Sequence, residues 1–252
     1  MGGTTKTIGA VERAFEIIEA IERLESAGAS AIADELSLSK STAYTHLHTL
    51  QEIGYLRKED GHYRLSGDFL RLGTAVQQGF PVYRRGRSHV EELADRTGER
   101  ANLVVEERGK GTCVHAANAG GAADGAMTRG ERRHMHATAT GKALLAHLPE
   151  DRVDEIVETH GLPSFTDHTI TSREALESEL AEIRETGIAI DAEESILGLR
   201  CFAAPILVEE TVIGSVSVSG PSRQFTDPDR EPELTEAVRE TANVIELDFV
   251  FG

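Results

Sequence analysis

The feature that most constrains the fold is a short helix, a tight turn and a second helix within residues 30–65. Apolar residues at helical spacing predict a first helix over residues 31–36 and a second over residues 40–53, with a turn at residues 37–39. Two short alternating runs then flank Glu59-Asp60-Gly61, which is a hairpin signal. A helix, a turn, a second helix and a hairpin together form the plan of a winged helix-turn-helix, a fold that reads DNA.

The second helix carries the side chains suited to contact with DNA. Ala43, Leu47, Leu50 and Ile53 recur at helical spacing, so we expect them to pack inward. Ser39 is expected to cap the helix, because its side-chain oxygen can accept from free N–H groups of the first turn. The opposite side of the helix and the basic hairpin would then meet bases and phosphates. The residues expected to contact DNA are Ser39, Lys40, Ser41, Thr42, Tyr44, Thr45, His48, Arg57, Lys58 and Arg64.

Taken over the whole chain, the net charge of −17 opposes DNA binding. Residues 1–78 carry 8 Lys and Arg against 11 Asp and Glu, whereas residues 79–252 carry 18 against 32. Residues 37–58 hold three cations and one anion, so the acid lies mainly outside the predicted reading surface. The chain also has 5 Lys against 21 Arg. A strongly acidic, lysine-poor surface is typical of proteins from salt-loving organisms, and we expect stability that rises with salt.

Length and composition exclude several classes of protein. A chain of 252 residues holds one or two domains. It has no run of eighteen apolar residues and no N-terminal signal pattern, so we expect a soluble cytoplasmic protein with no membrane partner. Its two cysteines, Cys113 and Cys201, do not form a disulfide framework. No phosphate-binding glycine fingerprint and no His-Glu-x-x-His motif is present, so we expect no cofactor.

The chain divides into three predicted parts. Residues 1–65 form the winged helix-turn-helix, residues 66–81 a linker helix, and residues 82–252 a second domain, since Gly79 and Pro81 interrupt the helical pattern. A first helix over residues 8–24 carries an apolar stripe that includes Val11, Phe15 and Ile21. Later strands and helices alternate irregularly, which favours an α+β domain on an antiparallel sheet. Residues 118–130 are rich in Gly and Ala and predict a mobile loop.

Several motifs, spread from about residue 8 to about residue 245, resemble those of a known family. They are Val11-Glu12-Arg13-Ala14-Phe15, Leu38-Ser39-Lys40-Ser41-Thr42, the run from His136 to Leu145, Asp191-Ala192-Glu193-Glu194 with the later Gly198-Leu199-Arg200-Cys201, and Ser217-Val218-Ser219-Gly220-Pro221. By these motifs the chain resembles the IclR family of transcriptional regulators. The first two motifs would be shared with many winged-helix proteins, but the later ones, in this order, are specific.

The resemblance implies a ligand-responsive switch. It implies an N-terminal winged helix, a linker helix and a C-terminal effector-binding domain related to GAF and profilin-like folds. It also implies homodimers or tetramers on palindromic operators in double-stranded DNA, and a small-molecule effector that is an organic acid or an aromatic compound. The effector pocket carried over by the resemblance comprises Ala139, Thr140, Asp191, Cys201, Ser217 and Ser219. Repression and activation both stay open.

The chemistry of the implied pocket suits an anion. Ser217 and Ser219 alternate along a strand, so both hydroxyls face one side. Ala139 and Thr140 begin a short helix, where free N–H groups could take a carboxylate. Asp191 complicates this, because an acid in an anion pocket must be protonated or accept from a ligand hydroxyl. His134 stands where the family usually has proline.

Parts of the sequence are also compatible with three other functions, which are an enzyme, a metal-responsive sensor and an adaptor. Cys201 with His115, His134 or His136 could form a nucleophile and base, but no orienting group is indicated. Cys113 and His115 would share one strand face, as would His134 and His136, and together with Cys201 they could hold zinc in a metal-responsive sensor. An adaptor that binds protein is disfavoured by the basic hairpin. We therefore expect a regulator with no catalytic residue and no metal site.

Overall fold

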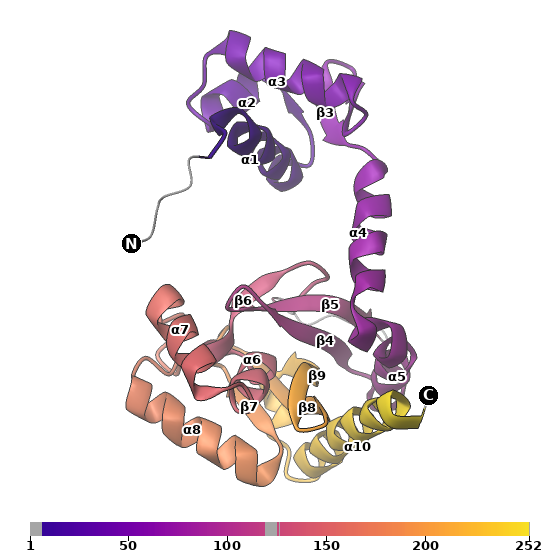
Figure 1. The fold of residues 1–252 in the computed structure, drawn as a ribbon, viewed down its shortest axis with the longest axis vertical. Coiled ribbons are helices and arrows are strands. Elements are labelled where there is room, and N and C mark those ends of the chain that lie inside the picture. The colour runs from indigo at the N-terminus through magenta and orange to yellow at the C-terminus, as the bar shows by residue number, and fades with distance from the viewer. Residues whose placement is uncertain (1–6, 119–124, 126, 252) are drawn as a thin grey trace. The chain divides into compact units, whose positions relative to one another are not determined.

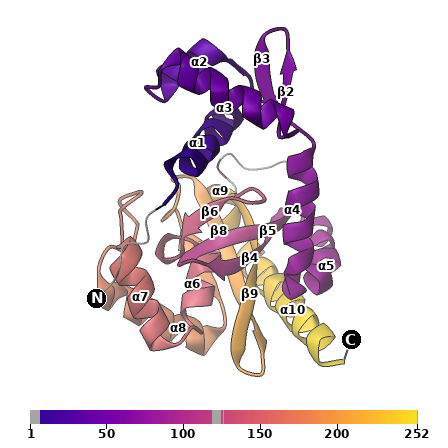
Figure 2. The same ribbon diagram turned by 45° about the horizontal axis from the view of Figure 1, so that its top comes forward.

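In its described residues, the first compact unit contains three complete helices, the first part of a fourth and a small antiparallel sheet. A computed structural model describes residues 7–118, 125 and 127–251. The helices are α1 (Gly9–Leu24), α2 (Ala29–Glu35) and α3 (Lys40–Glu52), and the strands are β1 (Ala27–Gly28), β2 (Leu56–Glu59) and β3 (His62–Leu65). Strand β3 pairs with both β1 and β2, and Figure 2 shows the β2–β3 hairpin standing off the helices. The predicted winged helix-turn-helix is confirmed.

Two residues expected in the core of this unit are instead exposed on α1. Val11 and Phe15 are 52% and 58% exposed, whereas Ile17 and Ile21 are fully buried. At 100° per residue, Val11 and Phe15 lie roughly 120–160° around the helix from Ile17, whereas Ile17, Ala20 and Ile21 face the core formed with α3 and β3. Helical periodicity identifies an apolar stripe, but it does not say which face of the helix packs on the core.

Ile53 was also expected in the core and is 59% exposed. Helix α3 ends one residue earlier, at Glu52, and Gly54 has a positive φ of 90° that turns the chain. Ile53 therefore leaves the helical phase of Ala43, Leu47 and Leu50. Tyr55 takes its place, because it packs on the core and meets the Phe69 ring edge-on at 5.3 Å.

Helix α4 (Asp68–Gly79) contains the point at which the chain divides into two compact units, Met1–Val76 and Gln77–Gly252. Helix α5 (Pro81–Thr97) follows after Phe80, and Pro81 occupies its first turn, where the missing N–H has no helical acceptor to lose. Gly98 ends α5 in the left-handed conformation.

The second unit is built on one six-stranded antiparallel sheet, as predicted. Its strand order is β6-β5-β4-β9-β8-β7. The strands are β4 (Arg100–Glu107), β5 (Lys110–Asn118), β6 (Arg132–His134), β7 (Ala189–Ala192), β8 (Leu199–Val208) and β9 (Thr211–Pro221). Helices α5 and α10 (Arg230–Phe251) cover one face, and α6 (Ala139–Leu145), α7 (Glu150–His160) and α8 (Arg173–Thr186) lie on the other (Figure 1). Each face has its own apolar core.

Some local elements differ from the sequence predictions. The strand expected over residues 132–137 ends at His134 and continues as a 3-10 turn, Met135–Ala137, because α6 packs closely against it at Gly141. A short helix, α9 (Ser222–Phe225), was not predicted. Within the loop predicted to be mobile, residues 119–124 and 126 lie outside the described residues.

Candidate functional site

A small cavity lies on the α6 face of the six-stranded sheet, and we call it the inner cavity. Its volume is about 30 Å³. All six residues of the pocket implied by the sequence line it, namely Ala139, Thr140, Asp191, Cys201, Ser217 and Ser219. Sequence reasoning missed six further lining residues, namely Asn102, Met127, Arg133, Thr138, Ser195 and Leu199. The structure thus brings the implied pocket together, while its binding of an effector stays a prediction.

The sheet register explains why residues so distant in sequence meet here. Asp191 on β7 stands opposite Cys201 on β8, and Cys201 stands opposite Ser219 on β9. Ser217, two residues before Ser219, stands opposite Asn102 on β4. Side chains at opposed positions of neighbouring strands share a face. Four strands therefore present one polar row beneath α6.

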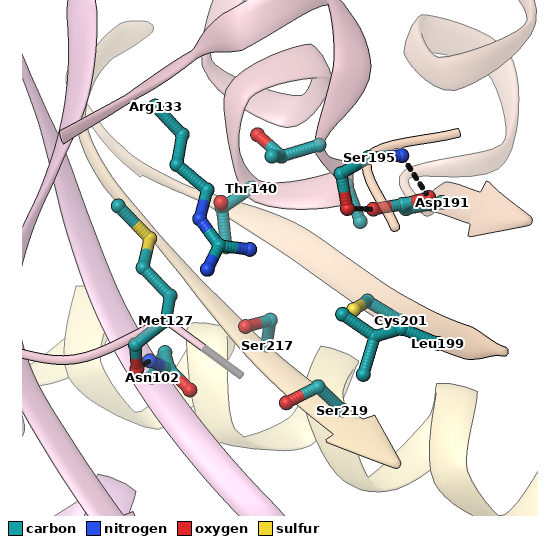
Figure 3. Close-up of a pocket in the computed structure, with 12 residues that line it drawn as sticks. Asn102, Met127, Arg133, Thr140, Asp191, Ser195, Leu199, Cys201, Ser217 and Ser219 are labelled. Atoms are coloured by element: carbon teal, nitrogen blue, oxygen red, sulfur yellow. Dashed lines mark hydrogen bonds between the residues drawn. The ribbon is translucent and has the colours of Figure 1, made fainter. Parts of the chain in front are cut away.

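The carboxylate of Asp191 is already engaged in hydrogen bonds within the protein and is not free to bind a ligand. Its carboxylate accepts from the Ser195 hydroxyl at 2.5 Å and from the backbone N–H groups of Glu194 and Ser195 at 2.8 and 3.3 Å (Figure 3). Burial raises the pKa of Asp191, and these hydrogen bonds partly oppose that rise. The main contacts of Asp191 thus hold the turn after β7 against the cavity.

Two polar atoms of the cavity wall lack a partner. Among the residues that the structure describes, neither Ser219 Oγ nor Asn102 Oδ1 makes a hydrogen bond, although both are buried. The amide nitrogen of Asn102 is engaged, because it donates to the Met127 carbonyl at 2.9 Å. A buried polar atom without a partner costs about 1–3 kcal/mol. Such a pair on a cavity wall favours a ligand that both donates and accepts there, as a hydroxyl does.

Arg133 places on the cavity wall a guanidinium that is ion-paired with Glu131, whose carboxylate lies 2.6 Å from Nη2. Its Nε donates to Glu131 at 2.7 Å and its Nη2 to the Gly125 carbonyl at 2.7 Å. In the described part of the chain, Nη1 has no hydrogen-bond acceptor, and Figure 3 shows the guanidinium directed into the cavity near Thr140. No local signal in the sequence marks this residue, because β6 ends at His134 and strand alternation does not continue to the buried Met135.

Behind the cavity lies a buried ion-pair cluster. Lys142 on α6 has no exposed surface, and its Nζ lies 2.6 Å from Glu194 and 2.7 Å from Glu179 of α8. Glu194 adjoins Ser195, which lines the cavity. One lysine therefore ties α6, α8 and the turn after β7 together.

On the predicted DNA-reading surface, the helix N-terminus has the expected cap. Ser39 Oγ accepts from the Thr42 N–H at 3.1 Å and also lies 2.8 Å from the Thr42 hydroxyl. The other predicted contacts on α3, which are Lys40, Ser41, Tyr44, Thr45 and His48, are all exposed. Thr45 donates its hydroxyl proton to the Ser41 carbonyl at 2.9 Å, so its oxygen and methyl group are what it can present to a base. The rings of Tyr44 and His48 stack at 6.1 Å.

The hairpin is less positive than its arginines suggest. Glu59 lies 3.0 Å from Arg57 and 3.8 Å from Arg64, while the Lys58 ammonium stands 4.9 Å above the Tyr63 ring. Residues 37–64 carry four cations and three anions, net +1, a smaller excess than residues 37–58 alone indicate. Exposed pairs of this kind contribute only about 0–1 kcal/mol. A phosphate can therefore replace Glu59 at little cost.

Comparison with known proteins decides the family. Residues 10–60 match the model described as "IclR helix-turn-helix domain", and residues 74–247 match "Bacterial transcriptional regulator IclR C-terminal". The chain belongs to the IclR family of transcriptional regulators.

Named relatives match this IclR-family chain over most of its length. It is 32% identical over 97% of its length, and 95% of the relative, to the "Probable HTH-type transcriptional regulator ArcR" of Halobacterium salinarum. It is 35% identical over 84% of its length, and 86% of the relative, to the regulator XynR of Escherichia coli. An IclR homologue of Microbacterium hydrocarbonoxydans, crystallised with 4-hydroxybenzoate, superposes with a TM-score of 0.80 at 26% identity, covering 96% of this chain and 100% of that one.

As a transcriptional regulator, this IclR-family chain is not an enzyme, and the structure also disfavours the alternative in which Cys201 is a nucleophile. Burial raises the pKa of the Cys201 thiol well above its usual value, and the nearby Asp191 charge raises it further. Cys201 is therefore a protonated thiol in the cavity wall, and a protonated thiol is a poor nucleophile.

The shared strand face predicted for the metal site is wrong. A β-bulge lies between Cys113 and His115, so that Val104 pairs with Cys113 but Leu103 pairs with His115. A bulge adds one residue and reverses the side-chain alternation beyond it. Cys113 consequently joins the core on the α6 face, while the His115 ring contacts Tyr83 of α5. The described residues contain no group of three or more His, Cys, Asp or Glu that could hold a metal.

No helix among the described residues is long and apolar enough to span a membrane.

Proposed function

We propose that this IclR-family regulator responds to a small organic acid that carries a hydroxyl group, bound in the inner cavity. The observation that carries the proposal is the combination of one cation, Arg133, with two unpartnered buried polar atoms, the hydroxyl Ser219 Oγ and the amide oxygen Asn102 Oδ1, on one cavity wall. An acid group would pair with Arg133. A ligand hydroxyl would accept from Ser219 and donate to Asn102. The homologue crystallised with 4-hydroxybenzoate binds a molecule with both groups.

The volume of the inner cavity limits what it holds in this conformation. About 10–15 Å³ holds one water molecule, so 30 Å³ holds roughly two water-sized groups. The cavity therefore accepts the polar groups of an effector, while the rest of the molecule must lie outside or open the cavity. Binding that opens the cavity favours one conformation over another, which is what a switch requires.

A thermal shift experiment tests this proposal. Hydroxy acids, 4-hydroxybenzoate among them, are titrated against the wild type, and a ligand at 100 times its Kd should stabilise the protein by about 2.7 kcal/mol. Ser217→Ala with Ser219→Ala, and separately Arg133→Met, should abolish the shift but leave DNA binding intact. A thermal shift that persists in both variants would mean that the effector binds outside the inner cavity.

We further propose how the DNA-reading surface works. A homodimer places two copies of α3 in successive major grooves of a palindromic operator, about 34 Å apart. Effector binding favours one arrangement of the α4 helices, which act as linkers between the units. The effect of the effector on DNA affinity must equal the effect of DNA on effector affinity. Both repression and activation of target genes by the effector-free protein are compatible with this mechanism. The protein would act in the cytoplasm.

A gel-shift series with the upstream region of the gene tests the roles of the α3 residues. Lys40→Ala should weaken binding to all sequences alike, because a lysine at the helix N-terminus meets phosphate. Thr42→Ala or Thr45→Ala should instead change the preference among operator variants. Lys110→Ala, which removes a lysine from the second unit, is the matched control. If Lys40→Ala behaves like that control, α3 does not lie in the groove as proposed.

The exposed apolar end of α1 supports dimerisation through the first unit. Ile8, Val11 and Phe15 are 70%, 52% and 58% exposed and are spaced for one helix face. Burying such a face against a second copy removes it from water. Phe15→Glu should therefore shift sedimentation toward a monomer and weaken operator binding. A Phe15→Glu protein with unchanged mass in solution would refute this interface.

A further inference from the structure

The exposed face of α3 carries a row of three threonines. Thr42, Thr45 and Thr49 are all exposed, whereas Ala43 and Leu47 of the same helix are buried. At about 100° per residue, the three threonines fall within about 60° of one another around the helix axis. In a helix-turn-helix domain the second helix is the element that enters the major groove. The threonine row therefore lies where α3 would meet the edges of the base pairs.

The hydroxyl groups of the threonine row are engaged within the helix itself. Thr45 donates its hydroxyl proton to the Ser41 carbonyl at 2.9 Å, and Thr49 donates to the Thr45 carbonyl at 2.8 Å. Thr42 Oγ1 lies 2.8 Å from Ser39 Oγ, which also accepts from the Thr42 N–H. A hydroxyl has one proton, so Thr45 and Thr49 cannot donate to a base while these bonds last. What they can present to DNA is a methyl group and an oxygen that only accepts.

The rest of α3 is poor in the side chains that most often read the other bases. Arginine commonly pairs with guanine, and asparagine or glutamine with adenine. Helix α3 contains no arginine and no asparagine, and its one glutamine, Gln51, is partly buried in the last turn. The methyl group of threonine, in contrast, packs on the C5 methyl group of thymine in the major groove. The composition of the exposed face thus favours thymine.

We propose that α3 reads thymine, through contact of the methyl groups of Thr42, Thr45 and Thr49 with the C5 methyl groups of the operator half-site. This inference rests on the proposed function, because α3 must lie in the major groove. A helix rises about 1.5 Å per residue, so Thr42 and Thr49 are about 10 Å apart along its axis. Base pairs stack about 3.4 Å apart, so the row spans about three base-pair steps of each half-site.

An apolar readout also suits the weak charge of this surface. Residues 37–64 carry a net charge of only +1, in a chain of net charge −17. A surface that neutralises few phosphates releases few counterions and gains little affinity from charge. Contact between methyl groups depends on removal of apolar surface from water and needs no positive charge.

The experiment removes only the thymine methyl group. The full chain first selects its preferred sites from a random-sequence duplex library, and the selected half-sites should contain A·T pairs over about three successive positions. The best duplex is then synthesised once with thymine and once with uracil at every thymine. Burial of one methyl group changes affinity about fourfold. Because several contacts are lost, the uracil duplex should bind at least about tenfold more weakly in a gel-shift titration.

A triple serine variant removes the same contacts from the protein side. Thr42→Ser with Thr45→Ser and Thr49→Ser keeps every hydroxyl and removes every methyl group of the row. It should lose most of the preference for thymine over uracil, because contacts between two groups are lost once either group is removed. Thr186→Ser on α8 is the matched control, since Thr186 is exposed and donates to the Glu182 carbonyl at 3.0 Å, again four residues earlier. This control should keep the full preference.

Two substitutions at Thr45 separate its methyl group from its hydroxyl. Thr45→Val keeps a methyl group and loses the hydroxyl, so it should retain a larger preference for the thymine duplex than Thr45→Ser does. If the oxygen of Thr45 instead accepted from an amino group of adenine or cytosine, the order would be reversed. Melting temperatures verify that all variants fold.

The outcomes separate this inference from the proposed function. A preference that falls in the triple serine variant and persists in Thr45→Val supports thymine reading. Equal binding of the two duplexes by the wild type, or a triple serine variant with the full preference, overturns it, as does the reversed order at Thr45. In each of those cases, weaker binding by Lys40→Ala still leaves α3 in the groove. If Lys40→Ala and the triple serine variant both bind like the wild type, both proposals are overturned.

Discussion

Replacing Lys142 tests whether the buried ion cluster holds the cavity together. Lys142→Met keeps the length and apolar stem of the side chain but removes the charge that lies 2.6 Å from Glu194. Glu194 is only 7% exposed, so the change leaves an unpaired carboxylate in a buried site. Removing one partner of a buried pair costs about 3–5 kcal/mol. For a chain of this size that corresponds to a fall in Tm of roughly 6–20 °C.

The dependence of this loss on pH has a definite sign. Burial raises the pKa of Glu194, and Lys142 is the charge that opposes the rise. Without the lysine, the folded-state pKa rises further above the unfolded value. A raised folded pKa contributes stability that is present below the unfolded pKa and is lost as pH rises through the folded pKa. The deficit of Lys142→Met should therefore be smaller at mildly acidic pH than at pH values above neutrality.

Urea unfolding at two pH values measures both effects. The double variant Lys142→Met with Glu194→Gln should recover much of the loss, because it removes the orphaned charge together with its partner. Lys110→Met, which removes a partly exposed lysine, is the matched control and should change stability by less than about 0.5 kcal/mol. A loss below about 1 kcal/mol for Lys142→Met, or no recovery in the double variant, would refute the cluster as a structural tie.

Three further results are expected. Gly141→Ala should destabilise the protein by more than about 3 kcal/mol in urea, because its Cβ would lie 2.3 Å from the Met135 backbone, whereas Gly73→Ala, with nothing within 4 Å, should not. Burial lowers the pKa of His136. Neutral His136 therefore contributes stability that is present above its unfolded pKa of about 6.5 and is lost as pH falls. His136→Gln should accordingly reduce the fall in Tm on acidification. The acidic surface should make Tm rise steeply from low salt to about 2 M KCl, and a flat curve would contradict adaptation to high salt.

Much of the first unit was predictable because its signals are local. Ser39 caps α3 through an atom three residues from its partner N–H, and Asp60-Gly61 turns the hairpin within two residues. Such contacts depend on sequence spacing alone. The error at Phe15 arose because spacing alone does not say which face of α1 packs on the core, and the error at Ile53 arose because α3 ends at Glu52.

The cavity shows the opposite case. Ser217 and Ser219 share a face by alternation, which the sequence reveals, and the family resemblance placed Asp191 and Cys201 with them. Asn102 and Arg133 were not predicted as lining residues, because their place at the cavity depends on which strands pair and in what register. The bulge before His115 likewise reverses a strand face, and no local signal marks it.

The sequence by itself determined the helix-turn-helix, the antiparallel class of the second unit and the family, because these depend on periodicity, on turn residues and on motif order. Only the tertiary structure decided which polar atoms are buried without a partner, which carboxylate is already engaged and where Lys142 finds its counter-charges. The physical reason is that burial and pairing are properties of groups distant in the chain. Asn102 and Ser219 are 117 positions apart, yet their unpartnered atoms lie on the wall of one cavity.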